Sequence, residues 1–158
     1  MIRKKILLLG DFNVGKTSLI RRYIDNSFED RYLTTIGVKI SKKALNLNTV
    51  ECELLIWDVE GATPQKKIPQ SYLLGASGAI FVADSAREET IQSLDDHIAA
   101  FLSVNPNAKY VVAYNKSDLL TVYEKTHMSL GKNGFFTSAK DGSHVISLFT
   151  QLAKDMLT

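Results

Sequence analysis

Residues 10–17 follow the pattern G-x-x-x-x-G-K-[ST], with Gly10, Gly15, Lys16 and Thr17 at the fixed positions. Glycines let a backbone wrap around an anion so that successive N–H groups point at phosphate oxygens. The lysine brings positive charge to the β- and γ-phosphates of a nucleotide, and the threonine hydroxyl is a hard oxygen ligand for Mg²⁺. The residues predicted to line this phosphate loop are Asp11, Phe12, Asn13, Val14, Gly15, Lys16, Thr17 and Ser18.

A chance match to this pattern somewhere in the chain has odds of about one in two hundred, given ordinary residue frequencies. The match also stands between an apolar, strand-like run at residues 6–9 and a helical pattern at residues 16–24. The strand delivers the loop, and the helix aims the positive end of its dipole at the same phosphates. The sequence therefore predicts nucleotide binding.

Residues 115–118, Asn-Lys-Ser-Asp, directly follow a second apolar run and could recognise the base. The Asp118 carboxylate can accept hydrogen bonds from N1–H and the exocyclic amine of guanine, whereas adenine has no such donor pair. Lys116 can lay its aliphatic stem along the ring. A wrong base would leave buried polar groups unpaired, which favours guanine selectivity. The pattern alone could be a polar turn, but after a phosphate loop it indicates a base site, completed by Asn115 and a second loop of Ser138, Ala139 and Lys140.

These loops need a scaffold in which strands alternate with helices. Strand-like runs occupy residues 6–9, 38–47, 51–58, 79–83, 110–114 and 135–137, and helical stripes occupy residues 16–24, 91–101 and 145–156. Such alternation predicts an α/β fold with a mostly parallel six-stranded sheet and helices on both faces. Ligands of such sheets bind beyond the carboxyl ends of the strands, where each motif falls. Whether residues 120–134 contain a full helix stays open.

The totals describe one ordinary globular domain spanning residues 1–158. A net charge of +2 favours neither nucleic acid nor an acidic membrane as partner. The one cysteine, Cys52, excludes an internal disulfide and suits a reducing compartment. No apolar run reaches the roughly 18 residues of a membrane span. With no residue to prenylate near the end and Ile2 unsuited to myristoylation, we expect a cytoplasmic chain without its own membrane anchor, although a partner could bring it to a membrane.

The order of the motifs resembles the Ras superfamily of small GTPases over essentially the whole chain. Between the phosphate loop and the base loop stand Thr35-Ile36-Gly37 and Asp58-x-x-Gly61. Thr35-Ile36-Gly37-Val38 and Ile56-Trp57-Asp58 are most similar to the Rab branch. The resemblance implies a P-loop NTPase G domain that binds GTP or GDP with Mg²⁺.

It also implies roles for individual residues. Tyr32 and Thr35 belong to the first switch, where Thr35 would bind Mg²⁺ and meet the γ-phosphate. Phe28 would pack edge-on against the base, Asp58 would reach Mg²⁺ through a water, and the Gly61 N–H would bond the γ-phosphate. The implied metal residues are Thr17, Thr35 and Asp58, and the implied catalytic residues are Lys16, Thr35 and Gly61. Loss of the γ-phosphate contacts on hydrolysis would relax both switches.

Two departures from the family pattern bear on catalysis. Ala62 stands where the family has the glutamine that orients the attacking water, and Phe12 replaces a small residue beside the γ-phosphate. Glu60 and Pro64 also depart from the pattern of the second switch, while Gln65 is nearby at the wrong spacing. The chain is therefore expected to be a GTP/GDP switch with weak GTPase activity.

Two other readings stay open. One is a hydrolysis-deficient G domain that serves as an interaction or dimerisation module, possibly within a larger protein. The other is a P-loop kinase, but no acceptor site or arginine-rich lid is evident. Effectors or regulators would meet the switches and an aromatic patch matched by Ile40, Trp57 and Tyr72, although Trp57 could simply cover the sheet. Lys66 and Lys67 could meet an acidic partner, whereas the residues expected to be merely solvated are Arg3, Lys4, Lys5, Lys42, Lys43, His97, His127 and His144.

Overall fold

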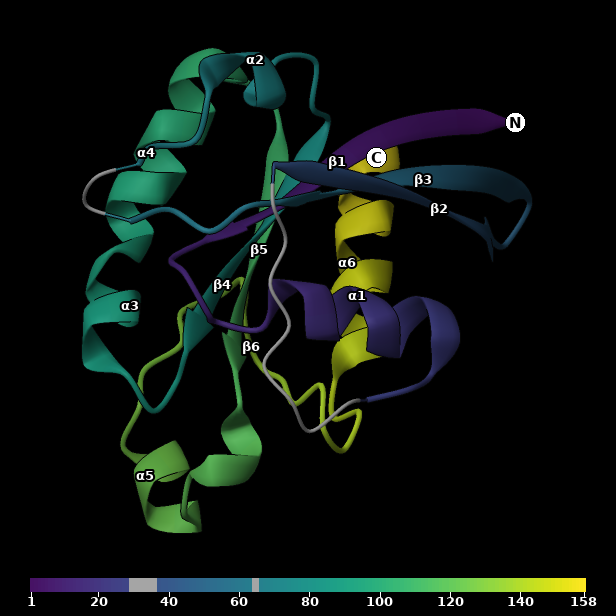
Figure 1. Ribbon diagram of the computed structural model, residues 1–158. Coiled ribbons are helices and arrows are strands. Elements are labelled where there is room, and N and C mark those ends of the chain that lie inside the picture. Colours follow the sequence, from purple (N-terminus) through teal and green to yellow (C-terminus); the bar gives the residue numbers. More distant parts are fainter. Residues whose placement is uncertain (29–36, 64–65) are drawn as a thin grey trace.

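One sheet of six strands, in the order β2-β3-β1-β4-β5-β6, organises the chain (Figure 1). The computed structural model describes residues 1–28, 37–63 and 66–158. The strands are β1 (Ile2–Gly10), β2 (Val38–Leu47), β3 (Val50–Val59), β4 (Gly78–Asp84), β5 (Lys109–Asn115) and β6 (Gly134–Phe136). Only the β2–β3 pair is antiparallel among the pairs of this sheet. The predicted α/β fold with a mostly parallel six-stranded sheet is confirmed.

Helices cover both faces of the sheet, as predicted (Figure 1). On one face lie α1 (Lys16–Asp25) and α6 (Val145–Leu157), whose rings Tyr23 and Phe149 stack with centroids 4.0 Å apart. On the other face lie α2 (Gln70–Leu73), α3 (Glu88–Gln92) and α4 (Leu94–Val104). Beyond β5, a 3₁₀ turn (Ser117–Leu119) leads to the short helix α5 (Val122–Thr126), so the region left open at 120–134 holds five helical residues.

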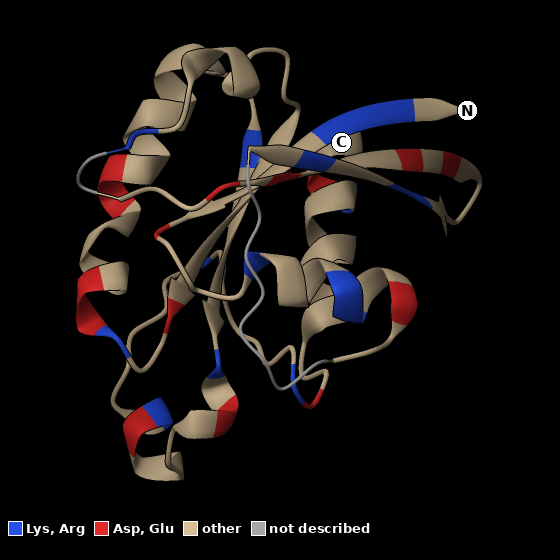
Figure 2. Ribbon diagram, in the orientation of Figure 1, with Lys and Arg blue, Asp and Glu red and all other residues tan. Residues whose placement is uncertain are grey.

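Burial explains why the inner strands read as continuous apolar runs. In β1, Ile6 and Leu8 enter the core beneath α1 and α6, while Leu7 and Leu9 enter the core beneath α4. Every residue of β4 is buried, as expected of a strand covered on both faces. Edge strand β2 instead alternates between half-buried and exposed positions. Basic and acidic segments are interspersed in Figure 2, in keeping with the net charge of +2.

The predicted helix over residues 91–101 is wrong in one respect, because the structure divides it at Ser93 into α3 and α4. The Ser93 hydroxyl lies 2.8 Å from the Glu89 carbonyl oxygen one turn earlier and 2.8 Å from a carboxylate oxygen of Asp11. Serine side chains that bond to the preceding turn compete with the regular helix pattern. Within the described residues, no helix combines the length and apolar character needed to cross a bilayer.

The topology brings the motifs together. Strands β1, β3, β4, β5 and β6 run in the same direction, so their carboxyl ends lie along one edge of the sheet. The phosphate loop follows β1, Asp58 stands near the end of β3, and the two predicted base loops follow β5 and β6. Asp84, the last residue of β4, lies at the same edge and belongs to none of the sequence motifs.

Candidate nucleotide site

The phosphate loop has the backbone shape that its sequence predicts. Asn13 and Gly15 have φ angles of 63° and 99°, in the left-handed region, and α1 begins at Lys16 immediately after them. Turns of this kind gather successive N–H groups into a concavity for an anion. Gly15 is required twice over, because a Cβ at that position would collide with the side-chain amide of Asn115.

The loop carbonyls are held by the loop's own lysine and by side chains of the base motif. Lys16 Nζ donates to the Asp11 carbonyl over 3.1 Å, and Lys116 Nζ donates to the Asn13 carbonyl over 3.1 Å. Asn115 Nδ2 donates to the Val14 carbonyl over 3.0 Å. Fixing a carbonyl outward turns the N–H of the same peptide group inward. The base motif therefore helps to shape the phosphate motif, a link that the sequence pattern alone did not reveal.

Lys16 is almost fully buried, with 6% of its surface exposed. Burial lowers its pKa to about 8, although the carboxylates of Asp58 and Asp11 act in the opposite direction. A buried ammonium group lacks the hydration that stabilises its charge. A nucleotide phosphate placed in the loop would supply the missing negative partner, so Lys16 suits an anion site far better than an empty one.

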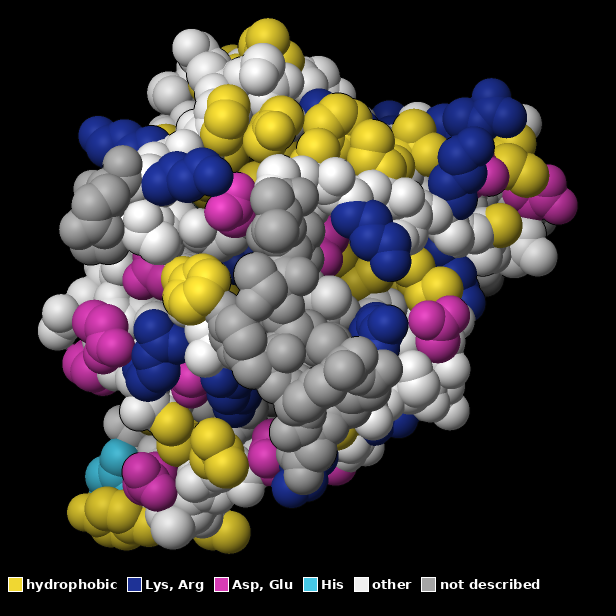
Figure 3. Space-filling model, viewed as in Figure 1, with side chains coloured by type: hydrophobic (Ala, Val, Ile, Leu, Met, Phe, Trp, Pro, Cys, Tyr) yellow, Lys and Arg dark blue, Asp and Glu magenta, His cyan; other side chains and the backbone are white. Residues whose placement is uncertain are grey.

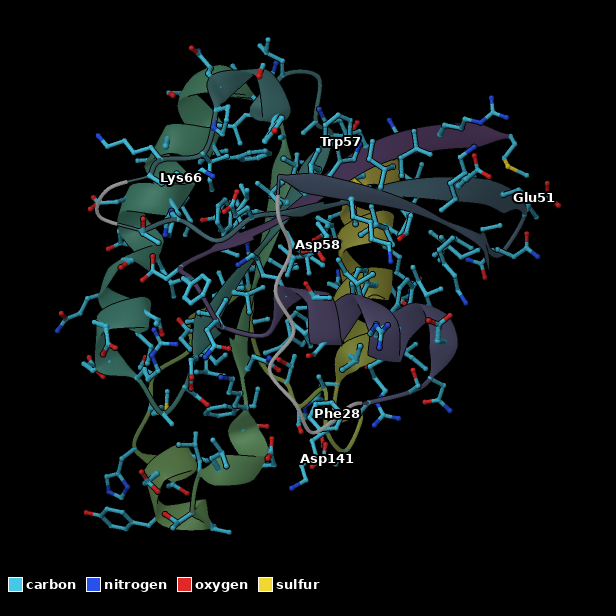
Figure 4. All side chains as sticks on the ribbon, in the orientation of Figure 1. Phe28, Glu51, Trp57, Asp58, Lys66 and Asp141 are labelled. Atoms are coloured by element: carbon cyan, nitrogen blue, oxygen red, sulfur yellow. The ribbon has the colours of Figure 1, made fainter. Side chains whose placement is uncertain are left out.

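Thr17 and Asp58 supply the oxygen atoms expected of a magnesium site. The Thr17 hydroxyl, at the start of α1, donates to Asp58 Oδ2 over 2.7 Å, and Asp58 is 3% exposed. A hydroxyl and a carboxylate are hard ligands of the kind that Mg²⁺ binds beside nucleotide phosphates. Figure 4 shows Asp58 directed toward α1, whereas its neighbour Trp57 lies on the opposite side of the sheet. The third predicted metal residue, Thr35, lies outside the described residues.

The two base loops are joined by side-chain bonds. The Ser138 hydroxyl donates to Asp118 Oδ1 over 2.7 Å, and the Thr137 hydroxyl donates to Asn115 Oδ1 over 3.1 Å. From α1, the guanidinium of Arg22 donates to the backbone carbonyls of Ala139 and Lys140. Asp118 is thus fixed at the exposed rim, where a carboxylate can meet a base. Phe28 is half-buried beyond the end of α1, at the same end of the molecule (Figure 4).

The segment that follows β3 pairs with the phosphate loop through its backbone. The Ala62 N–H donates to the Gly10 carbonyl and the Phe12 N–H donates to the Ala62 carbonyl, each over 3.1 Å. Gly61 passes so close that a Cβ there would lie 2.6 Å from the Cα atom of Phe12. Ala62 and Phe12 also line a cavity of about 890 Å³ that extends to α4. Ala62 is therefore held beside the phosphate loop, and its side chain ends at Cβ. Its match to the family's glutamine stays a prediction.

Glu60 connects the residue that precedes β2 to the segment that follows β3. Its backbone N–H donates to the Gly37 carbonyl over 2.8 Å, and its carboxylate accepts from the Gly37 N–H over 3.2 Å. Lys66 Nζ donates to the same carboxylate over 2.9 Å. The bonds from Lys66 and then from Gly37 lower the pKa of Glu60. Tyr32, Thr35, Pro64 and Gln65 lie outside the described residues, so the predictions for them stay predictions.

The aromatic patch has a firmer geometry than its sequence suggested. Ile40 is paired opposite Trp57 across β2 and β3, and the ring centroids of Trp57 and Tyr72 are 6.5 Å apart. Lys5, expected to be solvated, instead places Nζ 3.6 Å from the Trp57 ring centroid and donates to the Leu74 carbonyl over 2.7 Å. The negative face of an aromatic ring attracts a cation placed over it. Hydrophobic side chains follow one another across this upper face in Figure 3.

One histidine has a contact that the sequence did not predict. His97 Nε2 lies 2.8 Å from Asp11 Oδ1, and the His97 side chain is only 16% exposed. The expectation that His97 is a surface residue is therefore wrong, whereas His127 and His144 are exposed as predicted. The signal for this contact in the sequence was Asp11 itself, because a half-buried carboxylate in the phosphate loop needs hydrogen-bond partners.

The sheet, the phosphate loop after β1 and the base loop after β5 define a P-loop G domain. Comparison with known proteins agrees: the family described as "Ras of Complex, Roc, domain of DAPkinase" matches residues 5–118. Ras-related protein Rab-19 of Xenopus laevis is 33% identical, with 97% of this chain and 76% of that protein covered. Ras-related protein Rab-1D of Dictyostelium discoideum is 35% identical over 96% of this chain and 78% of its own length. The chain belongs to the Ras superfamily of small GTPases and is most similar to Rab proteins.

Proposed function

We propose that this small GTPase is a Mg²⁺-dependent GTP/GDP switch whose intrinsic hydrolysis is slow. The observation that carries the proposal is the contrast at residues 61 and 62. The backbone of this segment is bonded to Gly10 and Phe12, where a family member would present its catalytic glutamine, yet Ala62 offers only a methyl group. A methyl group neither orients a water molecule nor donates to the transition state.

The chain's own residues divide the work of binding. Inward amides of the phosphate loop and Lys16 would hold the β- and γ-phosphates, and Asp118 would select guanine. Thr17 and Asp58, with Thr35, would hold Mg²⁺, which screens the charge that develops on the phosphates. The Gly61 N–H would bond the γ-phosphate, so that its loss releases the second switch. Phe12, 43% exposed, would occupy the approach that a glutamine or an incoming arginine uses in relatives.

Single-turnover hydrolysis of GTP preloaded on the purified protein tests this proposal. We expect a rate at or below the intrinsic Ras rate of roughly 10⁻⁴ per second. A rate above about 10⁻² per second without a partner would contradict it, because that speed requires a residue to act on the attacking water. Thr17→Asn serves as the control for the metal: it should weaken Mg²⁺-dependent GTP binding far more than GDP binding, and equal losses would argue against the metal role.

The same observation favours a second candidate, a G domain that holds its nucleotide stably and acts as an interaction or dimerisation module. Tight binding of GTP together with no measurable turnover would support this candidate. Selectivity separates both from a P-loop kinase, since preference for ATP would exclude a guanine switch. In either guanine-binding role, effectors or regulators would dock on the switches and on the patch of Ile40, Trp57 and Tyr72, because Lys5 and Tyr72 fix the orientation of the Trp57 ring.

A further inference from the structure

We infer that Arg87, Ser93 and His97 form an outer clamp that holds the phosphate loop in its anion-binding shape and slows the release of nucleotide. All three residues come from the α3–α4 region and contact the loop from outside its own sequence. The inference rests on the proposed nucleotide binding and adds positioning residues that no motif of the sequence identifies.

Arg87 holds the tip of the loop. It immediately precedes α3, and its Nη1 donates to the Asn13 carbonyl over 3.1 Å and to the Phe12 carbonyl over 3.3 Å. The guanidinium is itself held, because Nε donates to Glu89 Oε1 over 3.2 Å and Nη1 lies 3.8 Å from Asp84 Oδ2. The Asp84 side chain is 4% exposed, so this interaction is poorly screened by water.

Ser93 and His97 hold the start of the loop through Asp11. The Ser93 hydroxyl lies 2.8 Å from Asp11 Oδ2, and His97 Nε2 lies 2.8 Å from Asp11 Oδ1. Both carboxylate oxygens of Asp11 are therefore engaged by residues of one helical region. The break between α3 and α4 falls at Ser93, whose single hydroxyl proton has two acceptors at 2.8 Å, the Asp11 carboxylate and the Glu89 carbonyl.

Holding the loop from outside matters because its functional shape is unfavourable without a ligand. Inward N–H groups repel one another electrostatically until an anion binds. Asn13 has a left-handed backbone, which asparagine adopts more easily than most residues but still as a minority conformation. Donors bound to the outer carbonyls oppose rotation of the same peptide groups. A loop already set in its bound shape loses less entropy on binding and gives tighter binding.

The clamp also connects the two halves of the nucleotide site. Lys116 of the base motif donates to the Asn13 carbonyl, which Arg87 also contacts. Lys116 Nζ lies 3.0 Å from Asp84 Oδ2, the oxygen that also faces the Arg87 guanidinium. The Asp84 carboxylate is therefore paired with two cations, Arg87 beside α3 and Lys116 of the base motif. Removal of Arg87 leaves Lys116 alone at this carbonyl and leaves the Phe12 carbonyl without its arginine donor.

The test measures release of a fluorescent GDP derivative in excess GDP, together with the dissociation constants of GDP and guanosine. For Arg87→Ala we expect release about tenfold faster than in the wild type, equivalent to about 1.4 kcal/mol. His97→Ala should accelerate release about threefold. Guanosine carries no phosphate, so its affinity should stay within about twofold of the wild type, whereas a general loss of structure would weaken both ligands.

Conservative variants show whether the donor itself matters. Arg87→Lys and His97→Gln keep a donor at nearly the same reach and should restore most of the slow release, while Arg3→Ala, at an exposed arginine paired with Glu53, should match the wild type. Wild-type release from Arg87→Ala, or equal losses for GDP and guanosine, would overturn the clamp. Failure of the wild type to retain GDP would instead overturn the proposed function. If Arg87→Ala does not fold, Ser93→Ala decides the matter, with release about twofold faster expected and an unchanged rate contradicting the clamp.

Discussion

The predicted nucleotide loops and the segment Gly61–Ala62 after β3 are both held at the carboxyl edge of the sheet, but by different kinds of bond. Side chains from distant elements hold the loops, as when Asn115 bonds the Val14 carbonyl and Arg22 bonds the carbonyls of the last loop. At Gly61 and Ala62 the recorded bonds are backbone to backbone. Side-chain bonds depend on residue identity, whereas backbone pairing survives a change from glutamine to alanine. The side-chain contacts that hold the loops and the backbone pairing of Ala62 therefore depend on different features of the sequence, so a substitution can affect one without the other.

Asp118→Asn gives the largest expected effect and tests the base side of the comparison. An amide in place of the carboxylate would present a donor where guanine also presents donors, so GDP affinity should fall on the order of 10⁴-fold. Xanthosine diphosphate, which has a carbonyl in place of the exocyclic amine, should bind better than GDP. Competition binding with both nucleotides measures the exchange. Unchanged GDP affinity would contradict the role of the Asp118 side chain in binding guanine.

Lys16 gives the next effect, which depends on pH. In the nucleotide-free protein its pKa is lowered to about 8, from 10.5, chiefly by burial. Between these values the unfolded chain binds the proton and the folded chain does not, so the free energy of unfolding should rise with pH. The rise attributable to Lys16 is roughly 3 kcal/mol, at about 1.4 kcal/mol per pKa unit.

Denaturant unfolding of the empty protein at pH 8 and pH 10 measures about two-thirds of this rise, roughly 2 kcal/mol, with Lys16→Met as the control. The variant lacks the ammonium group and should give the smaller rise. With GDP bound, phosphate charge should keep Lys16 protonated and flatten the wild-type curve. If the free energy of unfolding rose equally with pH in the empty wild type and in Lys16→Met, burial of the Lys16 ammonium group would not destabilise the empty protein.

Gly61→Ala tests the backbone side of the comparison. The added Cβ would lie 2.6 Å from the Cα atom and 2.9 Å from the nitrogen of Phe12, which are backbone atoms that cannot move aside alone. We expect unfolding to become easier by about 1–3 kcal/mol, in the range of overpacked sites. GDP affinity should change little, because the loops hold GDP through other residues. GTP affinity should fall, because the clash moves the residue-61 N–H away from its proposed position beside the γ-phosphate. An equal decrease for both nucleotides would show that the two regions are not independent.

The sequence predicted most of what depends on local pattern. Apolar runs such as residues 79–83 gave the buried strands, and the glycine-lysine-threonine spacing gave the phosphate loop, because both follow from short-range geometry. The alternation of strands and helices was also sufficient to predict that both faces of the sheet are covered.

Contacts between distant residues could not be predicted in this way. Neither the bond of His97 to Asp11 nor the position of Lys5 over Trp57 has a spacing rule, since each depends on the packing of elements far apart in sequence. The break at Ser93 was missed for the same reason, because a stripe of apolar residues continues through it while the serine bonds elsewhere. The sequence showed that Glu60 departs from the family pattern, but only the structure shows that its carboxylate bonds both the Gly37 N–H and Lys66.

Introducing glutamine at residue 62 gives the smallest expected effect, and it tests the role of this side chain directly. Ala62→Gln places the missing amide at the correct position of a backbone already bonded to the loop. Because Phe12 is proposed to occupy the approach to the γ-phosphate, the single change should raise hydrolysis less than about threefold. Combined with Phe12→Gly, it should raise the single-turnover rate about tenfold, or about 1.4 kcal/mol in activation free energy.

Phe12→Gly alone is the matched control, because it opens the space without supplying the amide and should leave the rate near that of the wild type. GDP release, measured on all three variants, should stay within about threefold of the wild type, since none of the changed side chains holds a phosphate-loop carbonyl. A tenfold gain from Ala62→Gln alone would show that Phe12 does not obstruct catalysis. No gain from the double variant would mean that the segment after β3, and not only its missing side chain, differs from that of hydrolytic relatives.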